Sequence, residues 1–196
     1  MGDLGQSSQV NGPSYHASGL AIQEGFIELV GESDPLAGTD NAHVDKIKVQ
    51  SWRGPDYVAD PTSDVAAVGW ILAENWWPYQ RPSFVTPPFA VYVSGHSTYS
   101  RAAAEVLTAF TGDRYFPGGR STFAIEKDRF LKFEKGPSVE MTLEWATYYD
   151  ASDQCSLSRI WGGIHPPADD IPGRQIGIEI GNDAFAYAKQ YFIGTE

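Results

Sequence analysis

Residues 158–169 read SRIWGGIHPPAD and lie between two segments whose apolar residues recur at helical spacing. Arg159 is placed on the last turns of the first segment, and His165 follows just past its end, beyond two glycines. This spacing allows both side chains to reach one point, where a guanidinium offers a planar fork to oxygen atoms. Asp169, four residues after His165, is placed to hold its Nδ1–H and so to present Nε2 as a ligand or nucleophile.

A second polar motif, Ser94-Gly95-His96, follows an extended, proline-rich stretch (81–93) and opens another predicted helix. Backbone N–H groups at a helix start lack helical partners, so an oxyanion placed there gains several hydrogen bonds. Ser94 adds a hydroxyl donor, Gly95 permits close approach of the backbone, and His96 can exchange a proton near pH 7. Arg81, in the tripeptide Gln-Arg-Pro, is a further candidate donor to an oxyanion.

Each of these residues taken singly has an ordinary structural explanation. A histidine beside a glycine is more often a satisfied structural residue, and an arginine at a helix end more often interacts with the last carbonyls. Arg81 can equally be a surface cation before a proline. The order of the motifs, Ser-Gly-His and then Ser-Arg-x5-His-x3-Asp, each beside a predicted helix, is far more specific than its parts.

The composition of the chain limits its class. Its 196 residues, 42% hydrophobic and 13% aromatic, can form one domain with a sizeable core. The formal net charge of −11, without a cluster of Lys or Arg, argues against binding of nucleic acid through a basic face. No apolar run approaches the roughly 20 residues of a membrane span. The single cysteine, Cys155, excludes an intramolecular disulfide framework, and zinc-finger spacing is absent.

We predict a mainly α fold with long ordered loops, in one domain (1–196) made of a loop-rich N-terminal segment (1–62) and a helical core (63–196). The predicted helices are 63–78, 97–110, 138–162 and 169–192. Ser63 and Ser138 are the expected N-caps and Gly112 the expected C-terminal stop, and we expect a loop over 112–136. Residues expected to face the core include Ala103, Val106, Leu107, Phe110, Ile176, Ile180, Phe185, Ala188 and Phe192. No segment shows sustained strand alternation.

The motifs resemble the superfamily of vanadium-dependent haloperoxidases and type 2 phosphatidic acid phosphatases. Its signature is a Lys-x6-Arg-Pro block, then Pro-Ser-Gly-His, then Ser-Arg-x5-His-x3-Asp. The last block matches fully at residues 158–169, and the middle one at residues 94–96, with Val93 where proline is usual. The resemblance covers roughly residues 65–192 and is strongest to the bacterial haloperoxidase-related branch.

The resemblance implies a soluble, all-α helical bundle with an oxyanion pocket that holds vanadate. His165 would be the axial ligand of vanadium and His96 the acid–base residue, with Asp169 supporting His165. The donors to the oxygens of vanadate would be Arg81, Ser94, Gly95 and Arg159. The substrates would then be hydrogen peroxide and halide. In the acid phosphatases of the superfamily the same pocket takes a phosphoester, which His165 would attack while His96 protonates the leaving oxygen.

Phe89, seven residues before His96, is similar to the aromatic residue found at this place in chloride-oxidising members. That resemblance suggests a position in the substrate pocket. Packing over the pocket is an equally good explanation of an aromatic residue there.

The first block is where the chain departs from the signature. If Arg81-Pro82 were the Arg-Pro of that block, the lysine would fall at position 74, which is Glu74, and a carboxylate in an oxyanion pocket would repel the cofactor. The alternative is that the block precedes Met1 and that the chain is a C-terminal portion of a longer enzyme, with residues 1–62 as the connecting loop. No signal peptide is recognisable in this sequence, any such segment would precede Met1, and the compartment is left open.

Three other hypotheses stay beside the enzyme. The chain could be a catalytically incomplete remnant that needs another segment or a second copy in a homo-oligomer. His96, His165 and Asp169 could form a two-histidine, one-carboxylate iron site, although that leaves Arg159 without a role. A Ser-His-Asp hydrolase fits worst, because no Gly-x-Ser-x-Gly elbow is present.

Overall fold

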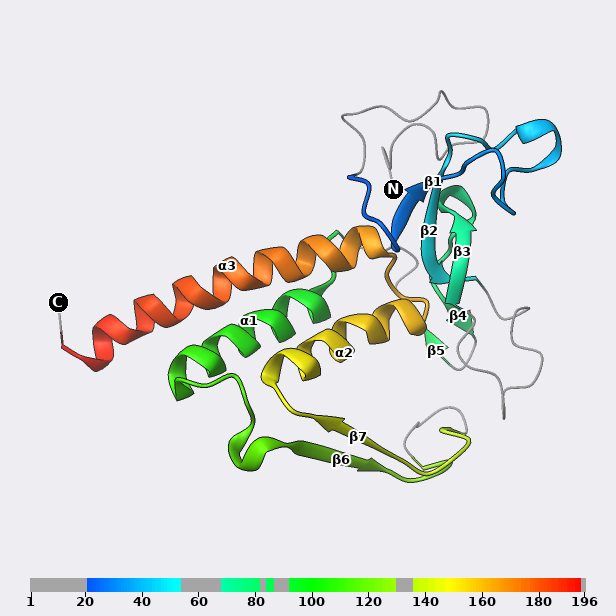
Figure 1. Cartoon of the computed structure of the whole chain (residues 1–196). Coiled ribbons are helices and arrows are strands. Elements are labelled where there is room, and N and C mark those ends of the chain that lie inside the picture. Colours follow the sequence, from blue (N-terminus) through cyan, green and yellow to red (C-terminus); the bar gives the residue numbers. More distant parts are fainter. Residues whose placement is uncertain (1–20, 54–67, 82–83, 87–91, 130–135, 195–196) are drawn as a thin grey trace. The chain divides into compact units, whose positions relative to one another are not determined.

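The computed structural model describes residues 21–53, 68–81, 84–86, 92–129 and 136–194 (Figure 1). The chain divides into two compact units. The first, here called the sheet unit, consists of Met1–Gln80, Thr86–Ala90 and Arg159–Asp169. The second, the helical unit, consists of Arg81–Val85, Val91–Ser158 and Asp170–Glu196.

The sheet unit is built on a three-stranded antiparallel sheet in the order β1-β2-β3, formed by β1 (Ile27–Leu29), β2 (Ile47–Trp52) and β3 (Val68–Leu72). Along β2 buried and half-buried residues alternate strictly, as expected for a strand with one face on a core. The buried core comprises Ile27, Ile47, Val49, Ala73 and Ala168. Ala168 belongs to the segment 158–169 that carries Arg159 and His165, so this segment is anchored in the sheet core.

The helical unit holds α1 (Gly95–Thr111) and most of α2 (Tyr148–Trp161) and α3 (Pro167–Phe192). An antiparallel hairpin of β6 (Ser121–Ile125) and β7 (Met141–Trp145) joins α1 to α2. The short strands β4 (Gln80–Arg81) and β5 (Phe84–Val85) pair with each other. The turn between α2 and α3 is part of the sheet unit.

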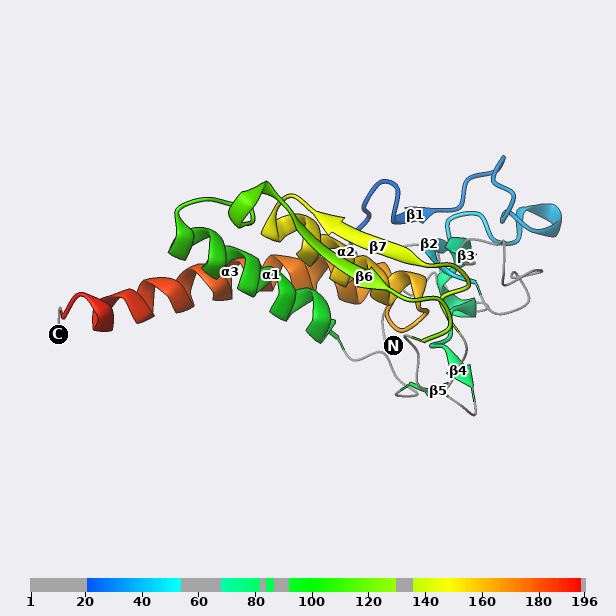
Figure 2. The same ribbon diagram turned by 90° about the horizontal axis from the view of Figure 1, so that it is seen from below.

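Close packing of α3 against α1 organises the helical unit, and the two helices run side by side in both Figure 1 and Figure 2. Three glycines spaced four residues apart, Gly173, Gly177 and Gly181, form the contact ridge of α3 and are all buried. A Cβ added to Gly177 would lie 2.6 Å from the carbonyl oxygen of Thr98, and one added to Gly181 would lie 2.6 Å from that of Ala102. The backbones therefore approach too closely for any side chain larger than hydrogen.

Helix α2 begins with a capping box. The Thr147 N–H donates to Asp150 Oδ2 (2.8 Å), and the Asp150 N–H donates to Thr147 Oγ1 (3.0 Å). The hydrogen bond from the Thr147 N–H is the largest of the effects that hold the pKa of Asp150 below its usual value. This reciprocal pair sets the first residue of the helix that carries Arg159.

Predictions for the middle helix and the last one are confirmed in part. The predicted helix 97–110 is α1, with Ser94 as N-cap and Gly112 as C-cap in the left-handed region (φ 73°). The last helix begins at Pro167, two residues before the predicted start, because proline is well suited to the first helical position. The stretch 81–93 was predicted to be extended. Its described residues include the second residue of β4 and the whole of β5.

The prediction of helix over 63–78 is wrong in its described part. Residues 68–72 form β3, and a 3-10 helix follows at Ala73–Asn75. Every residue of β3 pairs with a residue of β2; Val49, for example, lies opposite Ile71, and Gln50 opposite Trp70. This pairing overrides the helical spacing of the apolar residues. Ser63, the predicted N-cap, lies outside the described residues.

The predicted helix 138–162 is also wrong over its first third, which forms β7, and α2 starts only after the capping box at Thr147. The expected loop over 112–136 contains β6, and the expected loop over 1–62 contains β1 and β2. The absence of strands was the main error, and the mainly α class holds only in part. The described residues form three α-helices and seven short strands.

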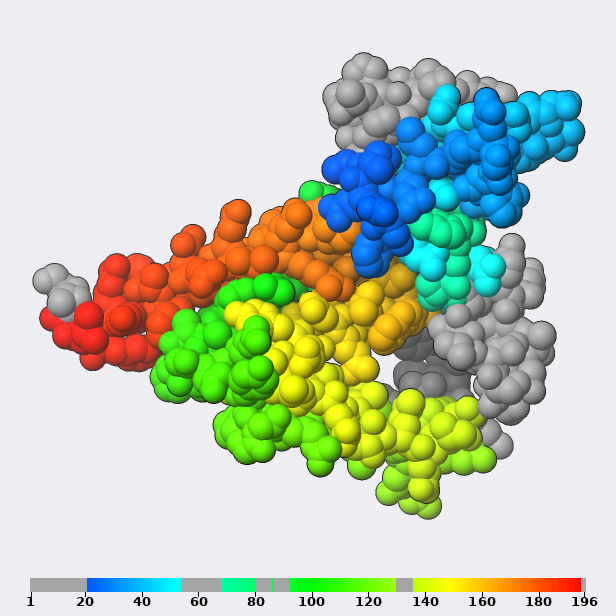
Figure 3. Space-filling model, in the orientation of Figure 1, coloured from blue at the N-terminus to red at the C-terminus, as the bar shows by residue number. Residues whose placement is uncertain are grey.

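The apolar faces predicted to be core are in fact largely exposed on α1 and α3. Leu107 and Phe110 are 41% and 71% exposed, and Ile180 and Phe192 are 50% and 73% exposed. The glycine ridge, not these larger residues, forms the α1–α3 contact. In Figure 3 the last turns of α3, coloured red, extend past the end of α1. In the described part of the chain, no helix has both the length and the apolar character that crossing a bilayer requires.

Replacement of Gly177 by alanine tests the close helix contact. We expect Gly177→Ala to lower the free energy of unfolding by about 1–3 kcal/mol, because the new methyl group meets backbone atoms that cannot move aside. This loss opposes the gain of roughly 1 kcal/mol that alanine brings to a helix interior. Denaturant unfolding followed by circular dichroism measures the difference.

Gly95→Ala is the matched control, since a Cβ at Gly95 meets no atom within 4 Å. It should leave the free energy of unfolding unchanged or slightly raised. Equal destabilisation by both replacements would contradict the role of the ridge.

The capping box predicts a pH-dependent contribution from Asp150. Its pKa is lowered in the folded chain, so its stabilising effect is complete above the pKa of the unfolded state and disappears as the pH falls through the folded-state value. Asp150→Ala should therefore cost about 1 kcal/mol at pH 7 and progressively less below pH about 4. Thermal unfolding measured from pH 7 to pH 3 gives the profile. Glu179→Gln, at an exposed position, is the control. The difference in thermal stability between this variant and the unmodified chain should not change in this way between pH 7 and pH 3.

Candidate functional site

His165 lies in the turn between α2 and α3, where Asp169 fixes its ring. The His165 Nδ1 is 3.1 Å from Asp169 Oδ2, and both side chains are nearly buried (14% and 9% exposed). An ionised carboxylate can only accept, so the Nδ1–H donates to it, and in the neutral ring the lone pair then lies on Nε2. This is the tautomer that the sequence motif predicts, and it makes Nε2 available as a ligand or nucleophile.

The backbone of this turn is tied to the end of α2. The carbonyl oxygen of Arg159 accepts hydrogen bonds from the N–H groups of Ile164 (2.9 Å) and His165 (3.2 Å). The structure thus joins Arg159 and His165 through the main chain within the sheet unit. Arg159 itself is half-buried.

Gly163 allows the turn to pack against β2. It adopts φ 68°, a left-handed conformation that favours glycine, and a Cβ on it would lie 2.5 Å from Trp52 Cε3. Its carbonyl oxygen accepts a hydrogen bond of 2.7 Å from the Tyr79 N–H, and Tyr79 in turn makes an edge-on ring contact with Trp52. A glycine at position 163 is therefore needed for packing against Trp52, and not only for its spacing in the motif.

The Ser94-Gly95-His96 motif forms the start of α1 in the helical unit. Ser94 is fully buried, whereas Gly95 and His96 are exposed. The Ser94 Oγ accepts the Ser97 N–H at 3.4 Å as the N-cap, and a Cβ at Gly95 would meet open space. The first helical N–H, that of Gly95, has no partner within the helix and can be approached from outside.

A buried cluster of hydroxyl and carboxylate groups lies behind this helix start. The Ser97 Oγ is 2.5 Å from Asp170 Oδ1 and 2.9 Å from Ser94 Oγ. Arg174 contacts Asp170 Oδ2 through Nη2 (3.0 Å) and Asp153 Oδ1 through Nη1 (3.1 Å). Ser97 and Asp170 are buried, and the cluster connects α1 to the first turns of α3.

Sequence reasoning missed Ser97, Asp170 and Arg174. Asp170 lies in the first turn of the predicted last helix, where a carboxylate is common, and a serine one residue after a histidine gives no signal of its own. The available signal was the four-residue spacing of Asp170 and Arg174, which places opposite charges on one helix face.

The remaining predicted residues are placed as follows. The backbone of Arg81 forms part of β4, and Phe89 lies outside the described residues. Glu74, which stands where the signature would have lysine, pairs with Lys46 at 2.8 Å and is 10% exposed. Its charge is thus compensated within the sheet unit. Among the described residues, no three His, Cys, Asp or Glu side chains are grouped so as to hold a metal ion.

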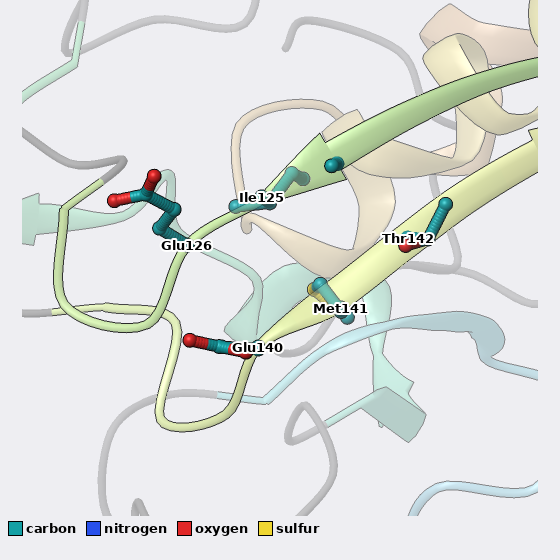
Figure 4. Close-up of a pocket in the computed structure, with 6 residues that line it drawn as sticks. Ile125, Glu126, Glu140, Met141 and Thr142 are labelled. Carbon is teal, nitrogen blue, oxygen red and sulfur yellow. The ribbon is translucent and has the colours of Figure 1, made fainter.

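A separate pocket of about 440 Å³ lies at the end of the β6–β7 hairpin (Figure 4). It is lined by Ala124, Ile125, Glu126, Glu140, Met141 and Thr142. No residue of the two motifs lines it, and its two carboxylates would repel an oxyanion. It is therefore unrelated to the candidate site.

Comparison with known proteins identifies the family of the chain. Residues 41–194 match the family model of the VCPO second helical-bundle domain. The chain belongs to this family and is related to the vanadium haloperoxidases. No curated protein sequence matches it significantly.

Solved structures that resemble the chain include an apo-type bacterial vanadium-dependent chloroperoxidase, with a TM-score of 0.50 and 17% identity over 73% of this chain. The holo-type bacterial chloroperoxidase gives 0.49 and 16% over the same share. A bacterial vanadium-dependent iodoperoxidase gives 0.37 and 30% over 53% of this chain. The chain spans only 28%, 27% and 22% of the length of these three proteins. The chloroperoxidase likeness supports the fold.

Gly163→Ala tests whether the turn that holds His165 depends on its glycine. The replacement meets both an unfavourable φ and the Trp52 ring, so we expect a loss of about 2–4 kcal/mol in the free energy of unfolding. Gly162→Ala, at the neighbouring position for which no positive φ is found, is the control and should cost less than 1 kcal/mol. Chemical unfolding measures the free energy of unfolding of both variants. Equal losses in the two would contradict the special role of Gly163.

Proposed function

We propose that the chain carries the vanadate-binding site of a haloperoxidase-like enzyme that oxidises halide with hydrogen peroxide. The observation that carries the proposal is the His165–Asp169 pair, in which the ring Nδ1 faces a carboxylate at 3.1 Å. Membership of the VCPO second helical-bundle family supports it. Vanadate, when bound, would supply the Lewis acid that activates peroxide towards halide.

The residues present suit such an anion. With Nδ1 facing Asp169, the neutral ring of His165 would present Nε2, which suits coordination to vanadium. At the start of α1 an exposed N–H group coincides with open space over Gly95, where an oxyanion can approach the backbone. In the proposal, Arg159, Arg81, Ser94 and Gly95 bind the oxygens of the anion.

His96 is the proposed acid–base residue. It is the second residue of α1 and is exposed, so it can exchange a proton with solvent and with a bound group. Asp169 acts on His165 by fixing its tautomer and orientation. The activity of a whole enzyme stays part of the proposal, because this chain spans little more than a quarter of the chloroperoxidases that it resembles.

Titration of the purified chain with orthovanadate by calorimetry, together with a halide-oxidation assay, tests the proposal. His165→Ala should abolish vanadate binding, whereas His96→Ala should retain binding and lose turnover. Arg159→Ala should weaken binding by about 2–4 kcal/mol, the effect of losing a partly buried charged donor. His43→Ala is the control, since this histidine bonds the carbonyl of Leu36 and should not affect binding.

The outcomes separate the alternatives. Binding together with peroxide-dependent halide oxidation would support a complete site. Binding without oxidation, accompanied by hydrolysis of a phosphoester, would favour a phosphatase. A folded chain that binds no vanadate, or wild-type activity in both His165→Ala and His96→Ala, would refute the assigned site.

A further inference from the structure

We propose that an exposed apolar surface shared by α1 and α3 binds a second copy of this chain. The surface, here called the α1–α3 face, consists of side chains that recur at helical spacing on the two helices. They are Tyr99, Ala103, Val106 and Phe110 on α1, and Ile176, Ile180, Ala184, Tyr187 and Tyr191 on α3. The face lies wholly in the helical unit and outside the two sequence motifs, so the inference is independent of the proposed function.

The contacts between the helices show that both parts of this face turn to the same side. Gly177 lies against Thr98 and Gly181 against Ala102, so α1 and α3 run parallel. Viewed from the N-termini, the face lies about 130° clockwise from the contact side on α1 and about 60° anticlockwise from it on α3. Helix α2 contacts α1 on the other side, for example at Ser100. The two stripes therefore form one surface that α2 leaves uncovered.

The size of this face matches one half of a protein–protein interface. Its four aromatic side chains are 58–80% exposed, namely Tyr99, Phe110, Tyr187 and Tyr191. With about 150–250 Å² per aromatic side chain, these four alone expose roughly 500–600 Å². The isoleucines, both also exposed, bring the surface to roughly 700–800 Å². A standard interface buries about 800 Å² per partner, whereas the largest apolar patch of a typical monomer is about 300–600 Å².

The charge pattern favours a second copy as the partner. The chain carries a formal net charge of −11, so two copies repel each other wherever their carboxylates meet. No residue of the α1–α3 face is charged, and Asp183 lies only at its edge. A basic partner would be attracted to a surface that presents carboxylates, and this face presents none. Two copies can meet here without bringing their acidic side chains together.

The arrangement of large and small side chains suits a two-fold axis. Ala103 lies in the middle of the α1 stripe and Ala184 in the middle of the α3 stripe, with the rings towards the ends. The parallel register places these alanines within about 3 Å of each other along the helix axes. A two-fold axis through this shallow middle lets the rings of each copy pack against the other. The hydroxyls of Tyr187 and Tyr191 bond each other at 2.6 Å, which lowers the cost of burying them.

Sedimentation equilibrium of the purified chain tests the proposal. Over a range of about 1–100 µM the chain should form a reversible dimer with twice its mass of 21.5 kDa. Ile180→Glu should raise the dissociation constant of the dimer at least about tenfold, because a carboxylate would be buried without a partner. Phe110→Glu should do the same from α1. Circular dichroism and Tm values first establish that both variants are folded.

Ile178→Glu is the matched control. Ile178 is also partly exposed, but it lies about 200° around α3 from Ile176 and so on the opposite side of the helix. Its replacement adds the same charge and should change the dissociation constant by less than about twofold. Equal weakening by Ile178→Glu and Ile180→Glu would overturn the proposal, as would a Phe110→Glu variant that dimerises like the unmodified chain.

Crosslinking gives a second test that depends little on the stability of the variants. Ala184→Cys, in a background where Cys155 is replaced by serine, should give a covalent dimer with a short bismaleimide, because the two copies of residue 184 lie near the two-fold axis. Ala186→Cys, exposed on the other side of α3, should give little dimer. Equal yields from both positions, or a chain that stays monomeric up to about 100 µM, would mean that something other than a second copy covers the face. Either result would overturn the proposal.

Discussion

The helical unit depends on the close approach of two backbones. Gly173, Gly177 and Gly181 bring α3 so near to α1 that an added Cβ would lie 2.6–3.0 Å from its carbonyl oxygens. The approach has a consequence for the site, because Gly173 lies directly against Ser94 and Ser97 at the start of α1. A wider separation of the helices would break the 2.5 Å contact between Ser97 and Asp170. The ridge thus sets the geometry of the buried polar cluster.

The first turn of α3 has a second consequence for the chemistry. Asp169 holds the ring of His165, and the next residue, Asp170, holds Ser97. Successive side chains on an α-helix point about 100° apart, so neighbouring carboxylates serve different partners. The first, Asp169, belongs to the sequence signature and contacts the ring of the candidate ligand His165. The second, Asp170, contacts Ser97 behind the Ser94-Gly95-His96 motif.

Local signals in the sequence were sufficient for the C-terminal end of α1. Gly112 was predicted as its stop because capping uses hydrogen bonds and backbone angles of a few adjacent residues, and the predicted start at residue 97 lies two residues after the observed one. The His165–Asp169 contact was likewise predictable, since only four residues separate these two side chains along the chain. Strands were not, because β3 and β7 are stabilised by partners that lie far away in the sequence or across a hairpin. Apolar residues at ambiguous spacing therefore favoured helices over 63–78 and over the first third of 138–162.

The sequence by itself determined the family and the pair of motifs, because these depend on residue types at short, fixed spacings. It also indicated the partner of the His165 ring, a carboxylate four residues away. Only the tertiary structure decided that glycines rather than the large apolar residues face α1, since a periodicity shows a face but not its partner. Tertiary structure alone also placed Asp170 beside Ser97, which is 73 residues away in the chain. Contacts between residues so far apart in the sequence arise from the packing of the fold, and no local sequence pattern predicts them.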